Sequence, residues 1–153
     1  NKFHGKINFI SPKANFWNSI GRRKKFFVGL FLLLIEILKD RKVLIFSFQG
    51  NVYCTLLCKL LGIKIIVRSN SAPDGWSQNK FKYLVFKYVL KSADKIFLSS
   101  EPYPFREKHI LALMKSTGLK RDQFQLIDGE LCSWHGSRMK QAFSKLPELL
   151  KCS

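Results

Sequence analysis

The feature that most constrains this chain is an alternation of two kinds of segment between Val43 and Ser100. Three short runs of apolar, largely β-branched residues, at 43–48, 63–68 and 95–98, are separated by two segments in which apolar residues recur at helical spacing. This order is typical of parallel strands joined by crossover helices. We therefore predict an α/β fold with a parallel sheet.

The surrounding sequence predicts further elements. We expect a strand over 6–11, a helix over 22–39, a helix that begins at Gly50-Asn51 and ends before Gly62, and a helix capped by Asn79. The last two helices have apolar stripes with the spacing of core residues. These stripes are Tyr53, Leu56, Leu57, Leu60 and Leu61, and then Phe81, Leu84, Val85, Tyr88 and Val89, with Lys80, Lys87 and Lys91 expected on the opposite, solvated face.

After Glu101, phenylalanine becomes less frequent and the alternation of strand-like and helix-like segments fades. We assign residues 1–101 to one partial domain and treat 102–153 as a weakly helical tail that fits no clear pattern. Within the tail, we expect a helix that ends over 114–118 and a short strand over Phe124–Ile127, and Pro147 interrupts a weak helix at 141–150.

The charge of the chain is strongly positive, with 27 Lys and Arg against 10 Asp and Glu in 153 residues. Such a surface favours anionic partners: nucleic acid, acidic lipid or phosphorylated small molecules. Nucleic acid is disfavoured, because Lys outnumbers Arg, the aromatic residues have core-like spacing, and no recognition motif occurs. Nucleotide bias in the genome accounts for part of the lysine excess.

The four cysteines, at 54, 58, 132 and 152, do not form a disulfide framework. Cys54 and Cys58 are four residues apart on an apolar helical face, where a free thiol packs as a small hydrophobe. Zinc would require closer Cys pairs with partnering His, so we expect no metal. Free cysteines fit a reducing, cytoplasmic setting.

The most apolar window, 26–38, contains thirteen residues including Glu36 and is too short to span a bilayer. We expect a buried crossover helix. The alternative is a helix on an anionic membrane surface, because Arg22, Arg23, Lys24 and Lys25 precede the apolar run.

Polar residues follow each predicted strand. Gln49 and Asn51 follow the first strand, Arg68, Ser69 and Asn70 end the second, and Ser99 and Ser100 end the third. In open parallel sheets, ligands bind at the carboxyl ends of the strands. The sequence therefore predicts a site where these side chains meet.

Three stretches resemble the amino-terminal, acceptor-side domain of family-four glycosyltransferases, bacterial enzymes of the B-type fold that build surface polysaccharides. They are SFQGN at 47–51, LLCKLLGIKIIVRSNSAPDGWSQN at 56–79 and KSADKIFLSS at 91–100. The resemblance implies a Rossmann-like domain at the cytoplasmic face of the plasma membrane. It also implies transfer of a sugar, without a metal or other cofactor, from a nucleotide-sugar donor to a glycan or lipid-linked hydroxyl.

The resemblance also suggests substrate-binding roles, although no catalytic residue is assigned. The cationic Arg68 would stabilise phosphate charge, the amides of Gln49 and Asn51 and the side chains of Ser69 and Asn70 would bind hydroxyls, and Trp76 would stack on a sugar ring. All of these residues except Gln49 also have a structural alternative. These are a salt bridge or loop anchor for Arg68, helix capping for Asn51, turn formation for Ser69 and Asn70, and loop packing for Trp76.

Two parts of the family pattern are missing: the Gly-rich first strand upstream of Lys6 and the carboxyl-terminal donor-binding domain. We therefore expect a fragment of a glycosyltransferase that does not catalyse transfer alone, with a divergent end, a premature stop or a frame shift as explanations for the tail. The alternatives are a basic module that binds anionic membrane or nucleic acid, and an inactive structural remnant.

Overall fold

The computed structural model describes residues 10, 19, 21–48, 51–69, 79–101, 103–129 and 145. The chain divides into two compact units, 1–43 and 44–153. The first unit contains helix α2 (Arg22–Lys39). The second contains β1 (Ile45–Ser47), α3 (Asn51–Leu61), β2 (Ile65–Ser69), α5 (Lys80–Ser92), β3 (Lys95–Ser99), α6 (Glu107–Thr117), the short 3₁₀ helix η1 (Arg121–Gln123) and β4 (Phe124–Ile127).

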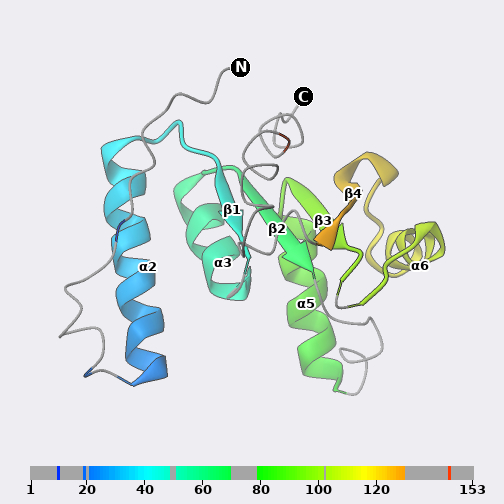
Figure 1. Ribbon diagram of the computed structural model, residues 1–153, viewed down its shortest axis with the longest axis horizontal. Helices are drawn as coiled ribbons and strands as arrows, with labels where there is room; N and C mark the ends of the chain where they lie inside the picture. The colour runs from blue at the N-terminus through cyan, green and yellow to red at the C-terminus, as the bar shows by residue number, and fades with distance from the viewer. Residues whose placement is uncertain are drawn as a thin grey trace. The chain divides into compact units, whose positions relative to one another are not determined.

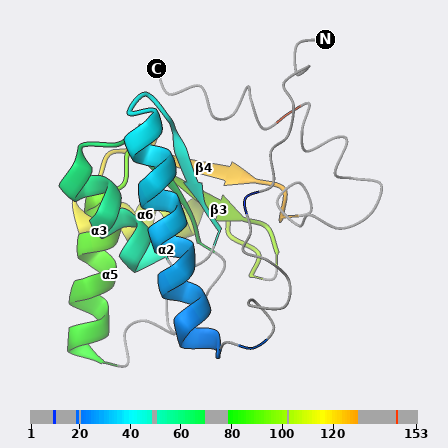
Figure 2. The same ribbon diagram turned by 90° about the vertical axis from the view of Figure 1, so that its left-hand side faces the viewer.

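The four strands of the described chain form one parallel sheet in the order β1-β2-β3-β4 (Figure 1). Each strand pairs with the one that precedes it in the chain. Because parallel crossovers are right-handed, this order directs successive helices to the same face of the sheet. Figure 2 shows α3 and α5 together on one side, and Tyr83 of α5 donates a hydrogen bond to the Ser116 carbonyl of α6 at 3.5 Å. The predicted α/β fold with a Rossmann-like parallel sheet is confirmed.

The ends of the helices follow from local sequence. Gly62 follows α3 with φ +68° and Gly118 follows α6 with φ +74°, a left-handed conformation that glycine adopts without strain. At the start of α5, the Asn79 side chain accepts a hydrogen bond from the Phe81 amide at 2.9 Å. The predicted cap and both predicted glycine ends are therefore confirmed.

The core lies around the two central strands. Ile65, Ile66 and Val67 of β2 are at most 1% exposed, and Ile96, Phe97 and Leu98 of β3 are fully buried. Nearly continuous apolar strands of this kind are expected when both faces of a sheet are covered. Asp94 lies at the opposite end from the predicted site, where its carboxylate accepts a hydrogen bond from the Ile65 amide at 2.7 Å.

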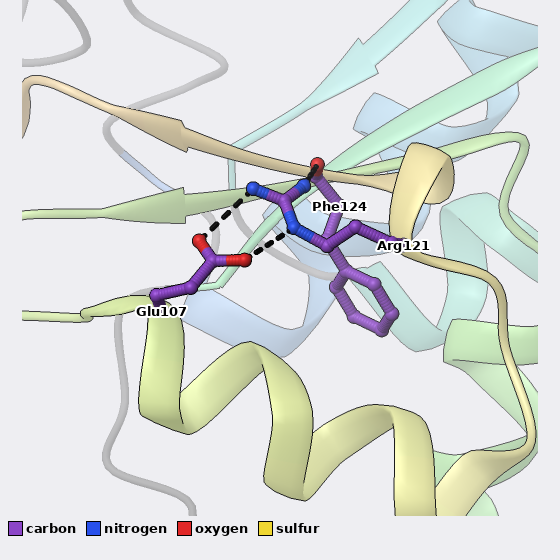
Figure 3. Close-up of polar contacts among 3 residues, drawn as sticks. All are labelled: Glu107, Arg121 and Phe124. Atoms are coloured by element: carbon purple, nitrogen blue, oxygen red, sulfur yellow. Dashed lines mark hydrogen bonds and ion pairs between the residues drawn. The ribbon is translucent and has the colours of Figure 1, made fainter.

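The alternation of strand and helix continues beyond Glu101, so the sheet takes its fourth strand from the segment 102–153. The predicted strand Phe124–Ile127 is confirmed as β4. Figure 3 shows how Arg121 joins α6 to β4. Its guanidinium binds both carboxylate oxygens of Glu107, at 2.5 and 3.0 Å, and donates to the Phe124 carbonyl at 2.7 Å.

The predicted apolar stripes are wrong as a guide to the core. The buried side chains of α3 are Thr55 and Cys58, and those of α5 are Val89 and Leu90. Most of the stripe residues are exposed instead, namely Tyr53, Leu56, Leu60, Phe81, Leu84 and Tyr88, and the exposed Lys80 and Lys91 share this solvent side. Apolar residues on these helices outnumber the positions that the sheet can cover, so spacing alone did not select the buried set.

Helix α2 also differs from the buried helix that the sequence predicted. Ile37 is fully buried, but Phe27, Phe31 and Leu38 are 60–66% exposed. The run 26–38 is apolar around most of the helix circumference, and one packing surface covers only one side of a helix. The predicted strand 6–11 falls almost entirely outside the described residues.

The capping hydrogen bond of Asn79 gives a direct test of how α5 begins. We expect Asn79→Ala to lower the free energy of unfolding by about 1 kcal/mol, because the Phe81 amide loses its acceptor. Asn79→Asp keeps an acceptor oxygen at the same place and should retain most of the stability. Urea unfolding followed by circular dichroism measures both, and an equal loss in the two variants would contradict this role.

Candidate functional site

The carboxyl ends of the strands bring together two of the polar tips that the sequence singled out. In the sheet, Arg68 lies beside Phe97 and Ser99 lies beside Ile127. The Arg68 guanidinium donates a hydrogen bond from Nη2 to the Ser99 hydroxyl at 3.1 Å. The predicted convergence is therefore present for β2 and β3, on the face of the sheet opposite Ser47 and Ser69.

The Arg68 side chain contacts Ser99, Glu101 and Phe48. Besides its bond to Ser99, Nη2 donates to the Glu101 carbonyl at 3.4 Å, and the guanidinium carbon lies 5.7 Å from the centre of the Phe48 ring. The Ser99 hydroxyl itself donates to the Glu101 carbonyl and is fully buried. Arg68 thus anchors the loop after β3, as one of the sequence alternatives expected, and its positive charge is fixed at the edge of the sheet.

Aromatic rings support this position of Arg68. The rings of Phe46 and Phe48 are 4.5 Å apart, and those of Phe46 and Phe97 are 5.4 Å apart, both in edge-to-face arrangements. Such a cluster restricts Phe48, whose ring lies against the guanidinium. The apolar surroundings also strengthen any interaction between that cation and an anion, because the local dielectric constant is lower than in water.

Asn51, at the start of α3, joins β1 to β2. Its Oδ1 accepts a hydrogen bond from the Ser47 hydroxyl at 2.9 Å, and its Nδ2 donates to the Arg68 carbonyl at 2.7 Å. The amide therefore spans two strands at their carboxyl ends, a role that neither helix capping nor hydroxyl binding had suggested.

The other predicted binding residues divide into two groups. Ser69 is only 6% exposed, so its hydroxyl lies within the packed edge. Gln49, Asn70 and Trp76 fall outside the described residues, and their proposed roles stay predictions.

The loop after β4 belongs to the same edge, which sequence reasoning missed. The Gly129 amide donates to the Ser100 hydroxyl at 2.9 Å, and the Ser100 amide donates to the Ile127 carbonyl at 3.0 Å. A Cβ atom at Gly129 would lie 2.7 Å from both the Glu101 Cβ and the Ser99 Oγ. The sequence signal was present as a glycine two residues after the strand 124–127.

His109, in the first turn of α6, was also missed. His109 Nδ1 accepts a hydrogen bond from the Arg106 amide at 2.9 Å, so the neutral ring has its proton on Nε2, which lies 3.1 Å from the Tyr103 hydroxyl. Phe105 completes the cluster, with its ring 5.9 Å from that of His109. The signal that could have pointed to His109 is its position in the first turn of a helix that follows a strand. These contacts order the start of α6.

The cysteines of α3 behave as packing residues. Cys58 is fully buried, and burial is the main reason why the pKa of its thiol is raised to about 11. Burial also raises the pKa of Cys54, partly opposed by a hydrogen bond with Ser47. The predicted core role is confirmed for Cys58, while residues 132 and 152 lie outside the description. Across the described ranges, no group of three or more His, Cys, Asp or Glu side chains could hold a metal ion.

Within the described parts of the chain, no helix has the length and apolarity needed to cross a bilayer. Comparison with family models, with curated proteins and with solved structures gave no match for this chain.

The close packing at Gly129 predicts a large effect of a small substitution. We expect Gly129→Ala to lower the free energy of unfolding by about 1–3 kcal/mol, because its Cβ would displace the loop that contains Glu101. Gly29, inside α2, has no atom within 4 Å of a Cβ placed there, and Gly29→Ala should instead stabilise by roughly 0.5–1 kcal/mol. Thermal unfolding of both variants tests the contrast, and loss of stability in neither would contradict the packing.

The raised pKa of Cys58 predicts slow alkylation and a loss of stability at high pH. The unfolded thiol ionises near pH 8.5, whereas the folded thiol does so near 11, so stability should fall as pH rises through that window. Iodoacetamide labelling at pH 8.5, read residue by residue by mass spectrometry, should modify Cys58 far more slowly in the native protein than in urea. Equal rates would show that the thiol is accessible.

Proposed function

We propose that this chain is the acceptor-side domain of a glycosyltransferase and binds a diphosphate-containing sugar substrate at the carboxyl edge of its sheet. The function is transfer of a sugar from a nucleotide-sugar donor to a glycan or lipid-linked acceptor, completed by a second domain. The observation that carries the proposal is the Arg68 guanidinium, fixed by Ser99 and Glu101 where the parallel strands end.

The chemistry of sugar transfer explains why a cation belongs at this position. Negative charge accumulates on the diphosphate as the bond to the sugar breaks, and preorganised donors stabilise that charge without reorganisation. A guanidinium offers several N–H groups in a plane, which suits phosphate oxygens. The first turn of α3 also points amide N–H groups toward the edge and contains no acidic residue, so its dipole adds positive potential.

The residue pattern supports the assignment of the substrate class. The stretches 47–51, 56–79 and 91–100, which resemble the glycosyltransferase family, include the first residue of α3, the end of β2 and the end of β3. All three places lie at the polar edge. A resemblance confined to buried positions would have supported the fold alone.

A binding experiment tests the proposal, because turnover is not expected from one domain. Calorimetry with UDP-glucose and with a short polyprenyl-diphosphate sugar should detect binding of at least one of them. Arg68→Gln should weaken that binding by about tenfold or more, the scale of one charge-assisted hydrogen bond. Arg68→Lys keeps the charge but not the planar geometry, and should give an intermediate affinity.

Lys64, which immediately precedes β2, provides a matched control at the opposite edge of the sheet. Lys64→Gln removes the same charge, and Lys64 is exposed, so affinity at fixed ionic strength should stay unchanged. Circular dichroism establishes that each variant is folded. Absence of binding to both ligands, or equal losses in Arg68→Gln and Lys64→Gln, would refute a site at this edge.

A further inference from the structure

The outer side of α3 and α5 exposes large apolar side chains. Leu60 is 84% exposed, Phe81 73% and Leu84 61%, and Tyr53, Leu56 and Tyr88 are exposed beside them. Single exposed apolar residues are ordinary on protein surfaces, but an adjoining set marks a surface that meets a partner or a membrane. We call these six residues and the lysines between them the helix surface.

The two helices form one continuous part of this surface. An open apolar groove of about 300 Å³ runs between them, lined by Val52 and Leu56 from α3 and by Leu84, Val85, Tyr88 and Val89 from α5. Leu56 of α3 and Leu84 of α5 therefore belong to the same patch. The sheet beneath is already packed against Cys58, Val89 and Leu90, so it does not draw these side chains inward.

The charged side chains of α3 and α5 are all positive. The sequences of α3 and α5 contain no Asp or Glu, and the only acidic residue of α6, Glu107, is paired with Arg121. The three helices together contain seven lysines, at positions 59, 80, 82, 87, 91, 108 and 115. Six of the seven are exposed, and Lys87 is half-buried. An occupant of the helix surface must therefore accept both apolar side chains and many cations.

We propose that the helix surface docks on an anionic lipid bilayer. A bilayer places acyl chains beneath negative headgroups, so Leu60, Phe81 and Leu84 can enter the interface while lysines remain among the phosphates. Tyr53 and Tyr88 have the amphipathic rings that favour this depth. The proposal does not depend on sugar transfer, because it concerns another surface and another ligand.

Other occupants fit the charge less well. A second copy of the chain would bring one lysine-rich surface against an identical one, and like charges across an interface are repulsive. Nucleic acid would neutralise the lysines but would leave the exposed leucines facing phosphates and water. An anionic bilayer satisfies both kinds of side chain at once.

Vesicle co-sedimentation of the full chain tests the proposal. The protein should bind vesicles of phosphatidylcholine mixed with phosphatidylglycerol, should bind phosphatidylcholine alone weakly, and should dissociate as salt rises. Leu60→Gln with Leu84→Gln should lower the partition coefficient about tenfold or more, because less apolar surface enters the interface. Lys59→Gln with Lys91→Gln should lower it on the order of thirtyfold, from two lost headgroup contacts.

Two sets of control variants locate the binding surface. Lys64→Gln with Lys120→Gln removes the same charge from exposed positions outside the three helices and should retain most of the binding. Phe27→Gln with Phe31→Gln removes exposed apolar groups from α2, which also has basic residues at its start, and should likewise retain it. Binding lost in these controls but kept in the helix-surface variants would overturn the proposal.

Measuring the oligomeric state tests the remaining alternative, in which a second copy of the chain covers the helix surface. Sedimentation velocity should find the same association state for the wild-type chain and for Leu60→Gln with Leu84→Gln. A wild-type dimer that this double change converts to monomer, with no binding to anionic vesicles, would overturn the proposal in favour of a second copy of the chain. All variants concern exposed side chains, and circular dichroism verifies their fold.

Discussion

The pairing of each strand with its predecessor determines the rest of the α/β unit. Because β1, β2, β3 and β4 are parallel and consecutive, every connection must return along the sheet, and right-handed crossovers bring those connections to one face. The same pairing aligns the carboxyl ends of the strands. Arg68 and Ser99, separated by 31 positions in sequence, are hydrogen-bonded only because their strands run side by side.

The positions of the strands and helices could be predicted because local chemistry determines them. Gly62 ends α3 and Asn79 caps α5 through interactions within a few residues. The choice of buried residues could not be predicted in this way. Thr55 and Cys58, rather than the leucines around them, face the interior of α3, and that choice depends on where the sheet lies relative to the helix.

The candidate site was predictable to a similar extent. The topology of parallel sheets placed Arg68 and Ser99 at one edge before any contact was known. The roles of their neighbours depend on tertiary contacts that sequence spacing does not contain: Asn51 links two strands, and Gly129 lies against Glu101. A glycine after a strand can serve a turn, a flexible loop or a close contact. For Gly129 only the packing against Glu101 and Ser99 shows that the close contact is the reason.

The consecutive strand order also affects how this unit can fold during synthesis. The first pair, β1 with β2, needs only residues 45–69, and each later strand adds to an edge that already exists. No described strand must wait for a distant partner, so loop closure costs little entropy at each step. The sheet can therefore grow in the order in which the ribosome releases it, and each new strand pairs with the edge strand opposite β1.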